Sequence, residues 1–216
     1  MKKHAKRPVA IITGGSGYVG RAIAAPLIEA GWLPILVSRA PTPMDGAIST
    51  PCDITDEAAV STTIKAIAAE YGAIAACIHA AAPATTRHTL VETPIKAFDE
   101  EFAVAVRGAY LLAKYATPYM SEGSAFIGNT TATTEKEKPD ARIGAYLPAK
   151  QALRTLLRVL AIELSAQQIR VHAVAPGVLP DGLNAGLPEA VRKLLARQKD
   201  GTTASADDVG KIVAEI

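Results

Sequence analysis

The sequence is poor in the features that mark several classes of protein. It has two cysteines in 216 residues, Cys52 and Cys77, and neither stands at a spacing typical of a metal site. Both lie in apolar segments, which predicts buried free thiols, no bound metal and a reducing, cytoplasmic location. No apolar run approaches the length of a membrane span. The net charge is only +2, so nothing in the composition calls for nucleic acid or a membrane surface as a partner.

The N-terminus also lacks the pattern of a signal peptide, because glycines soon interrupt the apolar run that follows it. Residues 1–7 hold the only basic cluster, and we expect them to form a solvated tail. Hydrophobic residues make up 49% of the chain, enough for a sizeable core. The length favours one domain over residues 1–216.

Strand-like and helix-like apolar patterns alternate along the chain. Strands are predicted at residues 9–13, 33–38, 48–52, 74–79, 125–128 and 169–175, and helices at 18–31, 56–71, 95–120, 145–166, 189–198 and 206–215. The strands are apolar almost throughout, which is typical of a parallel sheet covered on both sides. The predicted fold is therefore α/β, a doubly wound parallel sheet with helices on both faces (Rossmann-type), with its ligand beyond the carboxyl ends of the strands.

A glycine-rich turn, Gly-Gly-Ser-Gly-Tyr-Val-Gly at residues 14–20, joins the first strand to the first helix. The first N–H groups of a helix have no internal partner, and the helix dipole adds positive potential there. Gly14 and Gly17 would let a diphosphate approach the backbone, and Gly20 would let the helix lie close to the sheet. In this setting the turn predicts nucleotide binding.

The end of the second strand bears on the choice of nucleotide. Dehydrogenases that prefer NAD usually carry an acid at this point to bind the ribose 2′-hydroxyl, whereas this chain has Ser38 and Arg39. Arg39 would pair with a 2′-phosphate, which favours NADP(H) over NAD(H), unless it is simply a surface arginine. Asp53, after the third strand, would accept from the adenine amino group or serve only the local turn.

Tyr146 and Lys150 lie four residues apart at the start of a predicted helix, so they share one face. A tyrosine with a lowered pKa can donate a proton to a carbonyl oxygen and take it back. The alternative interpretation is a packed ring beside a solvated lysine. Their position just past the fifth strand, at the predicted ligand edge, favours the catalytic interpretation.

Three segments together resemble the short-chain dehydrogenase/reductase family: Thr-Gly-Gly-Ser-Gly-Tyr-Val-Gly at 13–20, Tyr-Leu-Pro-Ala-Lys at 146–150 and Arg-Val-His-Ala-Val-Ala-Pro-Gly at 170–177. The resemblance implies a Rossmann-type fold, an NAD(P)(H) cofactor and carbonyl–alcohol interconversion. It makes Tyr146 the acid/base, and Lys150 the group that lowers the tyrosine pKa and holds the nicotinamide ribose. The expected cofactor-binding residues are Gly14, Ser16, Gly17, Tyr18, Val19, Ser38, Arg39, Asp53, Ile54, Ala80, Ala81, Tyr146, Lys150, Pro176, Gly177 and Val178.

The chain also departs from the family pattern. The family's serine after the fifth strand is replaced by Thr130 or Thr131, although counting back from the tyrosine points to Thr133. A threonine hydroxyl can donate the same hydrogen bond to a substrate carbonyl. Ala105 stands where the family commonly has an asparagine that supports a water chain to the lysine, which puts that proton relay in doubt. The family's asparagine run after the fourth strand reads His79-Ala80-Ala81-Ala82, and we interpret His79 as structural.

The sequence thus predicts an NADP(H)-dependent oxidoreductase with Tyr146 as acid/base and a small-molecule carbonyl or alcohol as substrate. Residues 178–188 would form a substrate loop, mostly uncharged, which suits a small or apolar compound. The alternative is a catalytically weak or inactive nucleotide sensor or scaffold. The glycine spacing alone also suggests an epimerase or dehydratase. The strand that commonly ends the family's fold is missing, so a homodimer through the two long helices is compatible with the sequence and a tetramer is not expected.

Overall fold

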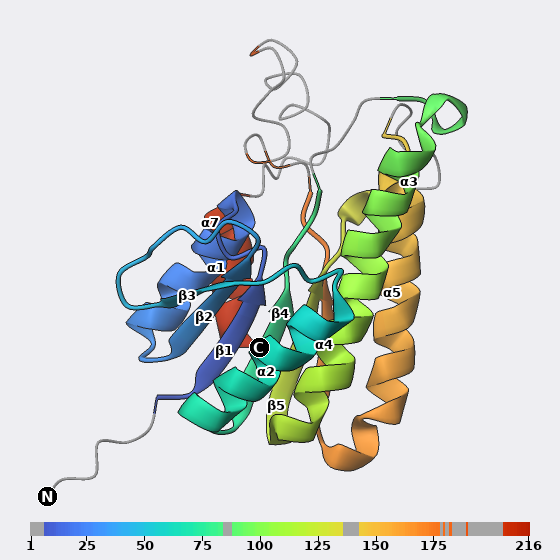
Figure 1. Ribbon diagram of the computed structural model, residues 1–216. Helices are drawn as coiled ribbons and strands as arrows, with labels where there is room; N and C mark the ends of the chain where they lie inside the picture. Colours follow the sequence, from blue (N-terminus) through green and yellow to red (C-terminus); the bar gives the residue numbers. More distant parts are fainter. Residues whose placement is uncertain are drawn as a thin grey trace, which may run out of the picture.

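The computed structural model describes residues 7–83, 88–135, 143–177, 179, 182, 189 and 205–216. Its centre is a sheet of six parallel strands in the order β3-β2-β1-β4-β5-β6 (Figure 1). The strands are β1 (Val9–Thr13), β2 (Leu33–Ser38), β3 (Ile48–Pro51), β4 (Ile74–His79), β5 (Met120–Asn129) and β6 (Arg170–Val174). The strand order reverses between β1 and β4, which confirms the predicted doubly wound fold and places a ligand crevice at that point.

Helices cover both faces of the sheet (Figure 1). One face carries α1 (Tyr18–Glu29) and α7 (Ala206–Glu215), and the other carries α2 (Glu57–Tyr71), α4 (Gly108–Ala116) and α5 (Tyr146–Glu163). Each strand residue points to the face opposite its neighbour, so Ile11 packs under α2 and Ile12 packs under α1. The near-continuous apolar strands therefore supply two separate cores.

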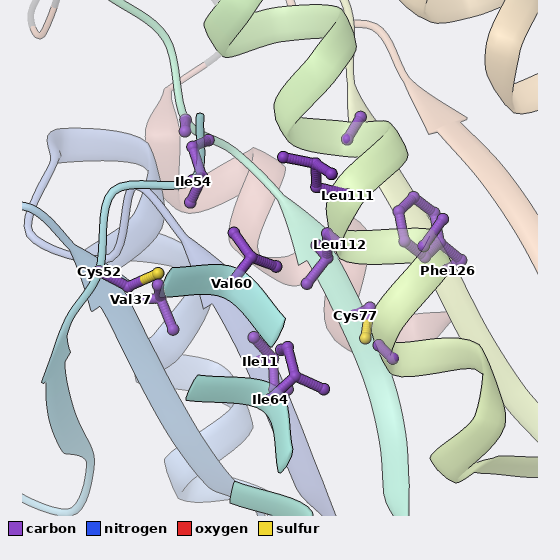
Figure 2. Packing of buried hydrophobic residues seen from close by; sticks show 14 of the residues in the cluster. Ile11, Val37, Cys52, Ile54, Val60, Ile64, Cys77, Leu111, Leu112 and Phe126 are labelled. Atoms are coloured by element: carbon purple, nitrogen blue, oxygen red, sulfur yellow. The ribbon is translucent and has the colours of Figure 1, made fainter. Parts of the chain in front are cut away.

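The core between the sheet and helices α2 and α4 is shown in Figure 2, where Ile64 of α2 and Leu112 of α4 lie in the same cluster as Phe126 of strand β5. Cys52 and Cys77 lie in this core as free thiols, and complete burial raises the pKa of the Cys77 thiol. Both cysteines thus pack as small apolar side chains. Among the described residues, no group of His, Cys, Asp and Glu side chains gathers in a way that could hold a metal ion.

The helix predicted over residues 95–120 is present to Tyr119, but it is not one uniform α-helix. The structure has α3 (Ile95–Phe102), a π-helical turn (Ala103–Arg107), α4 and a final 3₁₀ turn (Thr117–Tyr119). Pro118 lies in that last turn, and proline lacks the N–H that would continue an α-helix. Strand β5 starts directly afterwards at Met120, five residues earlier than predicted, and its register against β4 shifts between Ile74 and Ala76.

Near the two ends of the chain, some predictions from the sequence are confirmed and others are not. The helix predicted at 206–215 is confirmed and begins with a capping box between Ser205 and Asp208, whereas the helix predicted at 189–198 lies almost entirely outside the described residues. Arg7, expected in a solvated tail, instead donates hydrogen bonds to the carbonyls of Gly31, Trp32 and Gly46. In the described part of the chain no strand follows β6, and no helix is long and apolar enough to cross a membrane.

Candidate active site

A cavity of about 940 Å³ opens at the carboxyl ends of the strands, where the strand order reverses. Parallel strands end at the same edge of a sheet, so segments far apart in the sequence meet there. Most of the predicted site residues line it: Gly14, Gly17, Tyr18, Val19, Ser38, Arg39, Asp53, Ile54, Ala80, Ala81, Thr130, Thr131, Tyr146, Lys150, Pro176 and Gly177. Of the remaining two, Ser16 is not among the lining residues but lies within hydrogen-bond distance of Ser38, which is, and Val178 lies outside the described residues.

The glycine turn is packed so tightly that side chains are excluded from it. Gly14 has φ +70°, and a Cβ there would lie 2.7 Å from the Cα of Ala81. A Cβ on Gly20 would lie 2.3 Å from the carbonyl oxygen of Gly14. Gly20 therefore lets α1 close on the glycine turn itself, rather than on the sheet as the sequence analysis expected. The absence of side chains leaves backbone at the cavity surface.

The start of α1 differs from the starts of α2 and α7. Asp56 caps α2 by accepting from the N–H of Ala59, and Ser205 caps α7, whereas Gly17 gives α1 no side-chain cap and its first turn has no acidic residue. The helix N-terminus lies at the cavity, where Gly17 and Tyr18 line the wall. Unpartnered N–H groups and a positive dipole end fit the diphosphate of a dinucleotide.

The segment after β2 is held against the glycine turn through Ser16. The Ser16 hydroxyl lies 2.7 Å from the Ser38 hydroxyl, donates to the Ala40 carbonyl and accepts from the N–H of Thr42. Arg39 lies on this segment with most of its side chain exposed, and its guanidinium is 4.0 Å from the carboxylate of Glu100. An ion pair this long and exposed is weak, so Arg39 is free to turn toward a bound anion.

Asp53 performs the turn role that the sequence analysis offered as one of two alternatives. One of its carboxylate oxygens accepts from both the N–H and the hydroxyl of Thr55. These hydrogen bonds hold the pKa of Asp53 below its usual value. The residue also lines the cavity, as does Ile54, which packs closely against Gly108. The turn therefore fixes a carboxylate at the cavity wall.

The structure separates the three candidate threonines. The hydroxyl and the N–H of Thr130 both face the carbonyl of Val174, 3.1 and 2.8 Å away, which ties β5 to β6. The hydroxyl of Thr131 instead interacts with the hydroxyl of Tyr146 and also lies 3.4 Å from that of Thr133. Thr131 is thus the threonine whose hydroxyl faces the tyrosine.

Tyr146 and Lys150 occupy the first turn of α5, and both line the cavity. Lys150 is only 2% exposed, lies with Nζ 5.8 Å from the centre of the Tyr146 ring, and donates to the carbonyl of Asn129 at 2.7 Å. Burial lowers the pKa of Lys150 to about 8, although the charge of Glu101 opposes that change. The interpretation of a solvated lysine is therefore wrong.

The pKa of Tyr146 runs against the expectation from the family resemblance. Burial raises it to about 12, a hydrogen bond with Thr131 opposes the rise, and the charge of Glu101 adds to it. The family resemblance implied that Lys150 would lower the pKa of Tyr146. Burial of Lys150 disfavours the charged form of the lysine, and the negative charge of Glu101 acts on both residues. At neutral pH the phenol is therefore protonated.

His79 is fully buried, and its Nδ1 lies 2.9 Å from the Thr13 hydroxyl. Burial, with the charge of Lys150, lowers the pKa of His79 to about 3, against smaller opposing contributions from the backbone at Ala105 and Val104. A histidine that stays neutral in this way agrees with the structural interpretation. Ala105 is also fully buried and lies in the π-helical turn.

Sequence reasoning missed Glu101, which is 6% exposed and lies on α3 beside this cluster. Burial raises its pKa to about 7, while the charge of Lys150 opposes that rise and Glu100 adds to it. The sequence contains one signal that could have identified Glu101. It lies three residues after Phe98 and four before Ala105, so helical spacing places its carboxyl group on the apolar face of the predicted helix.

Comparisons with known proteins bear on the family of the chain. A family model described as Enoyl-(Acyl carrier protein) reductase matches residues 19–215. The chain is 31% identical over 218 residues to cis-4-hydroxycyclohexanecarboxylate dehydrogenase of Sinomonas cyclohexanicum, covering 95% of this chain and 87% of the relative. It is 28% identical over 233 residues to the chloroplastic NADPH-dependent aldehyde reductase-like protein of Arabidopsis thaliana, with coverage of 95% and 85%.

Among solved structures, a short chain dehydrogenase from Burkholderia cenocepacia in complex with NADP superposes on the chain with a TM-score of 0.84. The two are 23% identical, and the match covers 96% of this chain and 89% of the other. At this identity the match shows a common fold.

Proposed function

Because the chain belongs to the short-chain dehydrogenase/reductase family, we propose that it is an oxidoreductase that uses NADP(H) to interconvert a carbonyl compound and an alcohol. The observation that carries this proposal is the meeting of Tyr146, Lys150 and Thr131 with the uncapped start of α1 in one cavity. NADP(H), when bound, supplies or accepts the hydride. The protein supplies the proton, the orientation and the binding groups.

The residues at the start of α1 fit a dinucleotide by shape and by charge. The side-chain-free surface at Gly14 and Gly17 and the free N–H groups of the first turn would hold the diphosphate. Asp53 would meet the adenine, and Lys150 and Tyr146 the nicotinamide ribose. The other residues proposed to contact the cofactor are Tyr18, Val19, Ile54, Ala80, Ala81, Pro176, Gly177 and Val178, with Ser16 holding the segment after β2 in place.

The proposed preference for NADP(H) over NAD(H) rests on the end of β2. Ser38 and Arg39 stand there in place of an acid, and both line the cavity. A guanidinium can pair with a 2′-phosphate through two hydrogen bonds, whereas an acid would repel it. The names of two relatives support the proposal: one is called an NADPH-dependent reductase, and one solved structure contains NADP.

Tyr146 is the proposed proton donor, and its protonation state favours reduction of the carbonyl. With a pKa raised to about 12, the phenol keeps its proton at pH 7 and can give it to the oxygen of a carbonyl that receives hydride. Thr131, whose hydroxyl faces that of Tyr146, would donate a second hydrogen bond to the same oxygen. Oxidation of an alcohol requires the phenolate and would therefore be favoured only at higher pH.

The test has two parts, binding and turnover. NADPH and NADH are titrated against the protein by fluorescence, and oxidation of each is then followed with a panel of ketones, aldehydes and quinones. We expect tighter binding of NADPH and its consumption with at least one carbonyl. Failure to bind either nucleotide contradicts the proposal. Binding without turnover across the panel would instead favour a nucleotide sensor.

A further inference from the structure

Glu101 is the buried charged group that the proposed reaction leaves unused. It lies on α3 and is almost fully buried, and its Oε2 atom is inaccessible to solvent and has no hydrogen-bond partner. Glutamate is among the residues least often buried, and an unpartnered buried carboxyl oxygen lowers stability. A buried residue that costs stability in this way is a candidate for a role in function.

The surroundings of Glu101 are the catalytic groups. The π-helical turn that follows α3 packs against α5, as does α3 itself (Figure 1). The charge of Glu101 acts on Lys150 and on Tyr146 from across this contact, and Glu100 is the other charged group that acts on it. His79, on β4, stays neutral, and the charge of Lys150 contributes to the lowering of its pKa. Glu101 is therefore the negative charge that acts on Lys150.

Lys150 has unused hydrogen-bonding capacity. An ammonium group has three donors, and the structure gives Nζ one partner, the carbonyl of Asn129. No ion pair within 4.0 Å joins Lys150 to Glu101 in the described part of the chain. A water molecule could join two such groups. Ala105, one helical turn beyond Glu101, offers no polar side chain for this purpose.

We propose that Glu101 is the positioning and proton-exchange partner of Lys150, the buried carboxyl group that returns a proton to this lysine between turnovers. The inference rests on the proposed function and assigns a role that Ala105 cannot perform. The π-helical turn, which shifts the helix register between α3 and α4, places Glu101 and Ala105 beside α5.

The proton balance is simple. In reduction Tyr146 loses the proton of its hydroxyl to the carbonyl oxygen, and the phenolate takes one back from the ammonium of Lys150. The neutral amine then takes a proton from the carboxyl group of Glu101, directly or through water, and the carboxylate takes one from solvent. Each transfer breaks one O–H or N–H bond and forms another, and no electron is exchanged.

The first test needs neither substrate nor cofactor. The titration of Lys150 is followed by NMR in protein labelled with ¹³C at the lysine ε-carbon, and the resonance is assigned by its loss in Lys150→Arg. We expect Glu101→Gln to move the Lys150 midpoint about one pH unit lower, because an opposite charge nearby is removed. Asp99→Asn is the matched control, since it removes the same charge from an exposed position on α3. An unchanged midpoint in Glu101→Gln overturns the proposal.

The second test uses turnover with any carbonyl that the panel identifies. We expect Glu101→Gln to lower kcat about tenfold to a hundredfold, within the range for a lost acid–base group, and to move the alkaline limb of the pH profile to lower pH. Glu101→Asp, which keeps the carboxylate, should recover part of the rate, and Asp99→Asn should match wild type. An unaltered pH profile in Glu101→Gln contradicts the relay.

The two proposals fail in different ways. If the protein binds no NADP(H), the proposed function fails, while the NMR titration still decides whether Glu101 controls Lys150. If NADPH is consumed by wild type and by Glu101→Gln with the same rate and pH profile, the function stands and the role of Glu101 is refuted.

Discussion

The two ends of the cavity differ in what lines them. Where β1, β2 and α1 meet, the lining is backbone and exposed polar side chains: Gly14 and Gly17 exclude side chains, and Arg39 lies largely in solvent. Where β5, α3 and α5 meet, titratable side chains are withdrawn from water. Lys150 lines the cavity there, whereas Glu101 is not among its lining residues. Both are almost fully buried, and both pKa values move toward neutrality.

The difference shows how one fold divides two tasks. A diphosphate is bound by N–H groups and shape, which need small residues at fixed positions and no unusual proton affinity. Proton transfer needs groups whose proton affinities suit neutral pH, and burial provides this at a cost in stability. Substitutions at the first end should therefore alter geometry and nucleotide affinity, and those at the second should alter pH dependence.

The largest effect is expected for Tyr146→Phe, at the buried end. The change removes the only proposed proton donor, and general acid–base groups contribute about 10²–10⁴-fold to rate. Turnover should fall by about that factor, while NADPH affinity measured by fluorescence changes little. A variant that keeps more than a tenth of the wild-type rate would remove Tyr146 from its assigned role.

Gly14→Ala tests the backbone end. The new Cβ meets the backbone of Ala81 at 2.7 Å and the positive φ adds strain, so we expect a loss of about 3 kcal/mol of unfolding free energy or more, together with loss of NADPH binding. Gly31→Ala is the control, because its φ is +83° with open space around it. That variant should lose about 1 kcal/mol, from strain alone. Equal losses in urea titrations would show that crowding at the turn is unimportant.

Glu101→Gln should change how stability depends on pH. Folding raises the pKa of Glu101 from 4.5 to about 7, so its contribution to stability is complete below 4.5 and is lost as pH rises through 7. The loss is at most roughly 3 kcal/mol. Relative to wild type, the variant should therefore gain stability steadily between these pH values.

The measurement is the difference in unfolding free energy between wild type and Glu101→Gln, determined by urea titration at several pH values. His79 contributes in the opposite sense. Its pKa falls from 6.5 to about 3, so its stabilisation is complete above 6.5 and is lost as pH falls toward 3. Both proteins share this contribution, and it cancels. A constant difference from pH 4.5 to 7 would show that Glu101 is not held in a raised-pKa environment.

The smallest effect is expected for Arg39→Ala, at the exposed end. Hydrogen bonds to a charged group contribute about 1.5–3 kcal/mol, and exposure reduces this, so NADPH should bind about tenfold more weakly. NADH affinity should stay unchanged. Calorimetric titration of both nucleotides measures the change. If wild type already binds NADH more tightly than NADPH, the assignment of Arg39 is wrong.

The backbone end could be predicted from the sequence because its signals are local. A strand, a glycine turn and a helix follow one another in residues 9–29, and the structure places them as expected. Arg39 and Asp53 were found because each directly follows a strand. The buried end depends on contacts between distant segments. Thr131 follows β5, whereas Tyr146 lies on α5, and Glu101 lies on α3, whereas Lys150 lies on α5. Only the packing of these elements against one another brings these residues together, and no local pattern announces the π-helical turn at residues 103–107.

The most direct measurement follows the hydride. The protein is incubated with the carbonyl panel and NADPH that carries deuterium on the nicotinamide carbon that gives up the hydride, and the products are examined by mass spectrometry. The account predicts deuterium on the carbinol carbon of an alcohol product with wild type, and almost none with Tyr146→Phe that still binds NADPH. An equal yield of labelled alcohol from both proteins, or none from wild type with any carbonyl, would contradict it.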